Sequence, residues 1–243
     1  MDISNKVSNK DFIEPITNFF MNNISSCNLK PYFNICVSEN IVKDCMKYDK
    51  TINLNPDTKY AGLVILPSEV GNKIQILISQ NSCTPDTILH ELTHMYDFVN
   101  FSNYFCKGEL HKVKEHKYYQ TFIYWSEFHA KLIDIPYFSF LLGFNKTKDE
   151  IINEFTNNVK SFYYPEYTKK FLNKQNIGMT DIMWYLGELT VCKLYDQNNV
   201  YDIPENIIHT YGQRISELYN LLFHCLTFED FVKNIQCFHD LVY

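Results

Sequence analysis

The sequence predicts an α+β protein in which a small N-terminal antiparallel or mixed sheet leads into a helix, and a mostly helical C-terminal lobe follows. Two apolar runs, residues 60–67 and 72–79, are separated by the turn sequence SEVGN and have the β-branched content of strands. From Thr84 onward, the apolar residues recur at helical spacing. The chain has 243 residues, of which 46% are hydrophobic, so it can bury a sizeable core.

The expected elements follow in chain order. Residues 10–25 are expected to form a helix because their apolar side chains fall on one side. The segment 31–41 is a strand or leads into one, and the runs 60–67 and 72–79 are expected to pair as antiparallel strands. Further helices are expected over residues 85–101, 117–134, 148–160, 180–195, 204–224 and 227–240.

A polar segment with a glycine, GFNKTKDE at residues 143–150, is the best candidate for a domain boundary. We therefore expect an α+β lobe over residues 1–143, which contains the sheet and the two helices that follow it. A helical lobe over residues 144–243 is expected to complete one compact two-lobed protein. The sequence contains no internal repeat and no low-complexity tract.

Charge and composition narrow the class of function. The formal net charge is −6 and no basic run is long enough to neutralise a phosphate backbone, so nucleic acid is not an expected partner. The polar start, MDISNKVSNKDF, does not resemble a signal peptide, and the most apolar runs are too short to span a bilayer. We expect a cytoplasmic protein without a membrane partner. No feature of the sequence specifies an oligomeric state.

The eight cysteines are expected to be reduced and mostly buried as small hydrophobic residues. No C-x-x-C pair is present, so neither a cysteine-based zinc site nor a thioredoxin-like motif is expected. Cys225, Cys237 and His239 could together bind a metal, but their neighbours are typical of aromatic helix faces.

The segment TPDTILHELTHMYD, residues 84–97, contains two histidines four residues apart with a glutamate beside the first. Thr84 is a favourable N-cap, Pro85 suits the first helical position, and Asp86 complements the helix dipole. A helix is therefore expected to begin here, directly after the strands.

At helical spacing this helix has two faces. The apolar stripe expected to face the core consists of Ile88, Leu92, Met95 and Val99. His90, His94 and Asp97 fall on the opposite side, where two imidazoles one turn apart can reach one ion. The alternative is a pair of solvent-facing histidines on an ordinary helix.

The pattern HExxH at residues 90–94 resembles the active-site helix of the zincin metallopeptidases. In that superfamily strands precede the helix, an edge strand aligns an extended substrate beside the metal, and residues 60–100 are similar in that order. The resemblance implies His90 and His94 as ligands of one Zn²⁺ per chain. It implies Glu91 as the general base that acts on the water activated by the metal.

A catalytic zinc ion needs a third protein ligand. The metzincin extension would place glycine at position 97 and histidine at position 100, whereas this chain has Asp97 and Asn100. The segment YWSEFHAK, residues 124–131, offers Glu127 between small residues on an expected helix. Its SEFHA pattern resembles that of small gluzincin-like proteins of bacteria and their mobile elements, which implies Glu127 as the third ligand.

Several alternatives stay open at this stage. Glu127 could instead form an ion pair with Lys131 one turn later. The other candidates for the third ligand are Asp134, Glu109, Glu115, His116 and His129. Asp97 could fix the tautomer of a ligand histidine through a hydrogen bond, or contact a loop of the N-terminal lobe. No motif selects an oxyanion donor from the candidates His209, Tyr211, Tyr164 and Tyr185.

The expected function is that of a zinc-dependent metallopeptidase, a hydrolase of the gluzincin-like branch that acts on a peptide or protein substrate. Two alternatives remain. One is a non-catalytic protein that binds a metal or a partner. The other is a dedicated regulatory protease with a single protein target.

Overall fold

The computed structural model describes residues 9–25, 28–137 and 147–243. By its internal contacts the chain divides into two compact units, Met1–Val113 and Lys114–Tyr243. This division lies earlier than the boundary predicted within residues 143–150, of which residues 143–146 lie outside the described part. The reason is the helix that carries Glu127, which packs mainly on a helix of the C-terminal half and therefore belongs to the second unit.

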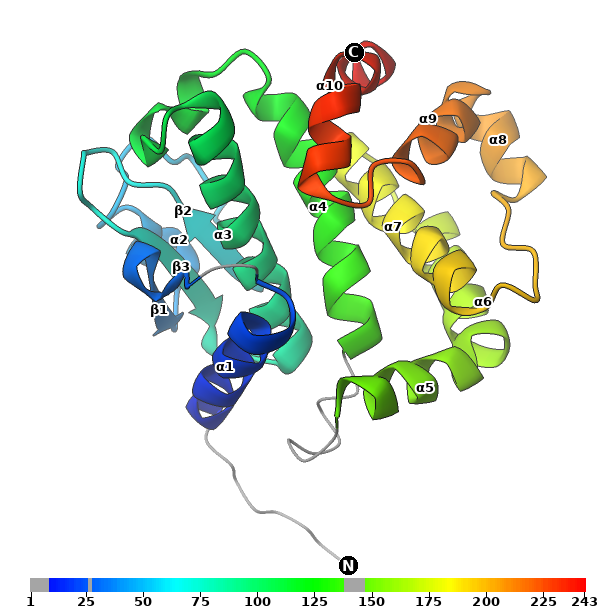
Figure 1. Ribbon diagram of the computed structural model, residues 1–243, viewed down its shortest axis with the longest axis horizontal. Helices are drawn as coiled ribbons and strands as arrows, with labels where there is room; N and C mark the ends of the chain where they lie inside the picture. Colours follow the sequence, from blue (N-terminus) through cyan, green and yellow to red (C-terminus); the bar gives the residue numbers. More distant parts are fainter. Residues whose placement is uncertain (1–8, 26–27, 138–146) are drawn as a thin grey trace, which may run out of the picture. The chain divides into compact units, whose positions relative to one another are not determined.

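A three-stranded mixed sheet forms the centre of the first unit (Figure 1). Its strands are β1 (Phe33–Ser38), β2 (Gly62–Ile65) and β3 (Ile74–Ser79), in the order β1-β3-β2. β1 pairs with β3 in parallel, and β2 pairs with β3 antiparallel. The antiparallel pair predicted over residues 60–79 is therefore confirmed, and β2 lies at one edge of the sheet.

Helices cover both faces of this sheet. The helices of the first unit are α1 (Ile13–Asn23, preceded by the 3₁₀ turn Asn9–Phe12), α2 (Ile41–Cys45) and α3 (Pro85–Phe105). α3 contacts α1, β2 and β3, whereas α2 packs with Leu77 of β3 in a separate apolar cluster. Since side chains alternate along a strand, Leu77 and its neighbours Ile76 and Ile78 face opposite sides, and all three are buried.

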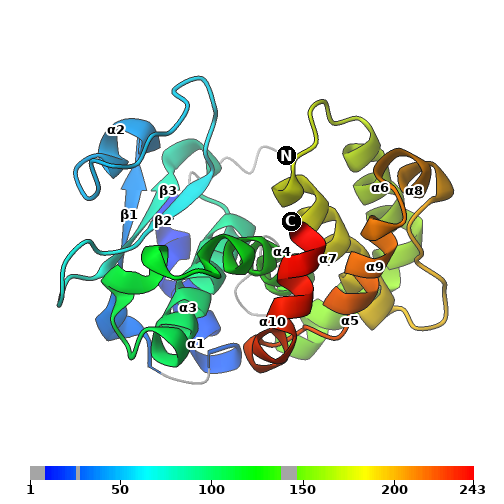
Figure 2. The same ribbon diagram turned by 90° about the horizontal axis from the view of Figure 1, so that it is seen from above.

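The second unit is helical, as predicted for this part of the chain (Figures 1 and 2). Its helices are α4 (Tyr119–Tyr137), α5 (Lys148–Asn158), the π-helical turn η6 (Val159–Tyr163), α6 (Tyr164–Leu172), α7 (Met179–Tyr195), α8 (Glu205–Tyr211), α9 (Arg214–Leu222) and α10 (Phe228–Val242). α4, α5, η6 and α6 all contact α7.

Two details of the helix prediction were wrong. The single helix expected over 204–224 is broken into α8 and α9, because Gly212 adopts φ +80°, a left-handed conformation that ends a helix. α6 was not predicted. It includes Pro165 in its first turn, where the missing N–H costs no hydrogen bond. Among the described residues, no helix is both long and apolar enough to cross a membrane.

The described cysteines are free thiols, and most of them are buried, as the composition predicts. Cys225 lies in the core of the second unit, where its carbonyl oxygen accepts a hydrogen bond from the indole N–H of Trp125 at 2.8 Å. His239 contacts Thr121 through Nδ1 at 2.7 Å, and Cys237 is exposed. These contacts agree with a packing role for this part of the chain.

Glu188 of α7 is a buried carboxyl group in the second unit. Burial raises the pKa of Glu188 to about 7, although the positive charge of nearby Lys131 opposes this shift. The other charged groups around it are Lys170, Lys174 and Asp134. A carboxyl group whose pKa is raised in the folded state holds a proton that the unfolded chain releases near pH 4.5. The destabilising contribution of Glu188 to the free energy of unfolding therefore grows as the pH rises from about 4.5 to about 7. Above pH 7 the contribution has reached its full value.

Replacing Glu188 with glutamine is expected to stabilise the protein by about 3 kcal/mol at pH 8 but only by about 1 kcal/mol at pH 5. Glutamine has the shape of the protonated acid and does not ionise. Urea unfolding at the two pH values measures the difference. Glu166→Gln on the exposed surface of α6 is the matched control and should change neither value. An equal effect of Glu188→Gln at both pH values would contradict the burial argument.

Candidate metal centre

The helix that carries both histidines, α3, begins at Pro85 as predicted. Thr84 has the extended backbone of an N-cap residue, but its side chain makes no capping bond to a backbone N–H. Its hydroxyl lies 2.9 Å from the hydroxyl of Thr87 instead. The start of the helix is therefore specified by Pro85 and by Asp86 in the first turn, and only the backbone role predicted for Thr84 is confirmed.

The predicted apolar stripe fixes how α3 is rotated about its axis. Its four residues are at most 2% exposed: Ile88, Leu92, Met95 and Val99. Because this stripe faces the core, the opposite side of the helix carries His90 and His94, both half-buried. Packing therefore determines where the two imidazoles point.

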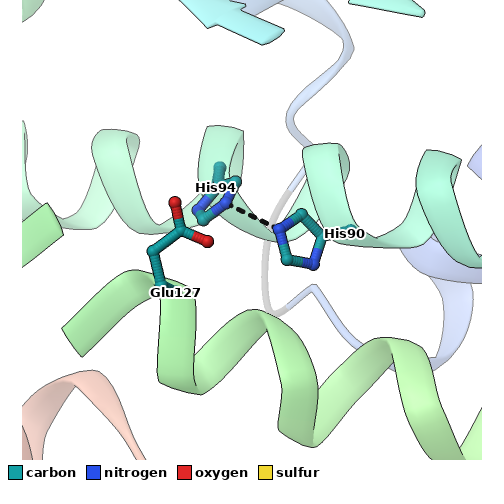
Figure 3. A group of neighbouring side chains, drawn as sticks. All are labelled: His90, His94 and Glu127. Atoms are coloured by element: carbon teal, nitrogen blue, oxygen red, sulfur yellow. Dashed lines mark hydrogen bonds between the residues drawn. The ribbon is translucent and has the colours of Figure 1, made fainter. Parts of the chain in front are cut away.

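The two imidazoles face each other through their Nε2 atoms, which are 3.1 Å apart (Figure 3). Their ring centroids are 4.6 Å apart and the rings are nearly perpendicular, at 89°. Two nitrogens at this separation, each bound to one zinc ion at its usual distance of about 2.0–2.1 Å, would subtend about 100° at the ion. That angle is close to the tetrahedral value. The distance between the two Nε2 atoms is thus compatible with a shared metal ion.

Glu91 lies beside this pair and is only 7% exposed. Its side chain occupies the space directly over Gly62 of the edge strand β2. A Cβ atom at position 62 would lie 2.5 Å from Cγ and 2.6 Å from Cδ of Glu91, closer than side-chain atoms approach one another. The absence of a side chain at Gly62 is what allows the Glu91 carboxylate to be held between α3 and the strand.

Glu127 lies on α4 and is half-buried. Its Oε2 accepts a hydrogen bond of 2.6 Å from the indole N–H of Trp184 on α7. The small residues on either side of Glu127, Ser126 and Ala130, are both fully buried. Lys131, the partner that the alternative interpretation gives to Glu127, forms an ion pair with Asp134 at 2.8 Å.

His90, His94 and Glu127 form a group in which one ligand atom from each residue lies within 4.8 Å of the others (Figure 3). Across the described ranges, it is the one group of three or more His, Cys, Asp or Glu side chains that could hold a metal ion. Two imidazoles and a carboxylate are a ligand set that suits zinc. The group is compatible with the HExxH pattern and consists of the three residues that the sequence suggested as ligands.

The alternative third ligands are not members of this group. Asp134 is paired with a lysine, as described above. His129 is buried and stacks on Trp125, with ring centroids 4.7 Å apart and planes at 15°. The remaining candidates lie in the segment between α3 and α4: Glu109, Glu115 and His116. Of these, Glu109 is half-buried and forms an ion pair with Lys112.

Two further expectations stay predictions. Asp97 is fully buried on α3, and its hydrogen bond to a ligand histidine remains a prediction. No oxyanion donor is assigned. Tyr185 is buried in a stack with Phe171, and His209 is exposed near the end of α8. The contacts of the other candidates, Tyr164 and Tyr211, are with residues of the second unit.

Two residues beside the candidate site were not predicted from the sequence: Gly62, which lies against Glu91, and Trp184, which contacts Glu127. Trp184 belongs to the segment MWYLGELTVCKLY, whose composition predicts core packing, but its side chain is half-buried and makes a polar contact. No local pattern marks Gly62, because its role depends on the packing of α3 against β2. Comparisons of the chain with protein-family models, curated proteins and solved structures found no match.

Proposed function

We propose that this protein is a zinc-dependent metallopeptidase that hydrolyses peptide bonds. The observation that carries the proposal is the group of His90, His94 and Glu127 next to the buried carboxylate of Glu91. Zinc-dependent hydrolases use such a ligand set, three protein groups with a fourth position left for water or substrate. In this proposal the three residues bind one Zn²⁺ per chain.

Zinc, when bound, supplies a Lewis acid that polarises a carbonyl group and lowers the pKa of water to about 7. The residues of the chain do the rest. Glu91 directly follows His90 on α3, so its carboxylate is anchored on the same helical turn as a ligand. It would take a proton from the water as the new C–O bond forms. It would then give that proton to the amine nitrogen as the C–N bond breaks.

The edge strand β2 supports a peptide as the substrate. β2 pairs with β3 on one side only in the described sheet, and its Gly62 lies directly under Glu91. An extended peptide can add to the outer side of such a strand through main-chain hydrogen bonds. A peptide bound in this way would pass close to the proposed general base, where one of its bonds could be cleaved.

Zinc-dependent peptide cleavage is the expected result when the purified full chain is incubated with a library of unstructured peptides. A chelator such as EDTA should abolish the cleavage, and stoichiometric Zn²⁺ added after removal of the chelator should restore it, because in this proposal His90, His94 and Glu127 bind the ion reversibly. Mass spectrometry of the products measures both. Metal binding without any cleavage would favour the non-catalytic alternative. Cleavage that continues in excess chelator would contradict a metal-dependent mechanism.

A further inference from the structure

The carboxylate of Glu127 has a dedicated hydrogen-bond donor in the second unit. Trp184 of α7 donates its indole N–H to Oε2 of Glu127 at 2.6 Å, a short distance for an N–H···O bond. We propose that Trp184 is a positioning residue that orients the Glu127 carboxylate as a metal ligand. This inference rests on the function proposed above, since it assigns a role to a residue that supports one of the three ligands.

This contact is possible because α4 and α7 pack closely at Gly187, which lies one helical turn after Trp184 on α7. A Cβ atom at Gly187 would lie 2.7 Å from Cβ of Lys131 and 3.0 Å from the carbonyl oxygen of Phe128. α4 and α7 can therefore approach closely at Gly187 only because it has no side chain. Trp184 precedes Gly187 by one turn, and Glu127 precedes Lys131 by one turn. The close approach thus brings the indole and the carboxylate together.

The indole ring itself is held by two cations. The ammonium groups of Lys174 and Lys131 lie 4.9 and 5.6 Å from the centroid of the Trp184 ring. Each lysine is in turn paired with an aspartate, Lys131 with Asp134 and Lys174 with Asp181. Cation–π contacts of this kind are attractive, because the face of the indole ring carries partial negative charge. They restrain the ring so that its N–H points steadily at Glu127.

An indole suits this role for a chemical reason. Its N–H donates a hydrogen bond but cannot accept one, does not ionise and does not bind zinc. It therefore fixes the rotation of the carboxylate without competing with Glu127 for the metal. A ligand held in this way loses less conformational entropy when the ion binds. Loss of a hydrogen-bond partner that orients a metal ligand typically weakens metal binding about 10- to 100-fold.

Replacing Trp184 with phenylalanine is expected to weaken Zn²⁺ binding about 10- to 100-fold, because the ring remains but the N–H is lost. The affinity is measured by competition with a chromophoric chelator, using the full chain. Trp125→Phe is the matched control. It also removes one indole N–H from the second unit, but that group donates to the carbonyl of Cys225 and not to Glu127. Circular dichroism confirms that each variant is folded.

A second pair of variants separates positioning from general stabilisation. In a Glu127→Ala background there is no carboxylate to orient, so adding Trp184→Phe should weaken Zn²⁺ binding no further. In ¹⁵N-labelled protein, the indole signal of Trp184 should shift on addition of Zn²⁺, and this shift should be absent in Glu127→Ala. An equal loss of affinity with and without Glu127, or an unchanged affinity in Trp184→Phe, would overturn the inference alone. A wild-type chain that binds no Zn²⁺ would overturn the proposed function with it.

Discussion

Replacing Glu91 with glutamine is expected to lower peptide hydrolysis about 10²- to 10⁴-fold, the usual contribution of a general acid–base group, while zinc remains bound. Glutamine has nearly the same shape as glutamate, so it still fills the space over Gly62 and leaves the backbone of α3 unchanged. It cannot accept the proton of the attacking water. The loss should therefore appear in kcat with little change in KM.

The measurement combines turnover of a cleaved peptide with the metal content of the same preparation. Glu109→Gln is the matched control, since Glu109 is paired with Lys112 and is not a member of the candidate metal-ligand group. It should retain wild-type turnover. Turnover of Glu91→Gln within tenfold of the wild-type value, at equal zinc content, would remove Glu91 from the mechanism.

The histidine face of α3 could be predicted from the sequence because its determinants are local. The positions of Pro85 and Asp86 specify the start of the helix, and the buried apolar stripe specifies its rotation. Once those are known, the side on which His90 and His94 lie follows from helical geometry. The antiparallel pairing of β2 and β3 is also local, since only residues 66–73 separate the two strands along the chain.

What the sequence does not predict depends on contacts between distant segments. Glu127 and Trp184 are 57 residues apart, and their hydrogen bond requires the close packing of α4 on α7. The space for Glu91 is provided by Gly62 of β2. This contact depends on two non-local packings, the pairing of β2 with β3 and the packing of β2 against α3. The division of the chain near Val113 follows from the same non-local packing of α4.

Removal of the imidazole in His94→Ala is expected to weaken zinc binding by about 10²- to 10³-fold or more. A four-ligand zinc site is worth roughly 10–16 kcal/mol, and an even division among its ligands gives about 2.5–4 kcal/mol for each. His94 lies outside the apolar stripe of α3, so the variant should remain folded. His209→Ala is the matched control because His209 is exposed on α8, and it should keep one zinc ion per chain.

The same measurement on Glu127→Ala and Asp134→Ala identifies the third ligand. Glu127→Ala should lose zinc affinity to about the same extent as His94→Ala. The loss should be larger than in Trp184→Phe, because Glu127→Ala removes a ligand whereas Trp184→Phe removes only the hydrogen bond that orients it. Asp134→Ala should bind zinc as the wild type does, since its carboxylate pairs with Lys131. If zinc is lost from Asp134→Ala and retained in Glu127→Ala, the roles of the two carboxylates are reversed. Zinc retained in His94→Ala would mean that the ion is bound elsewhere, and the proposed metal centre would then be wrong.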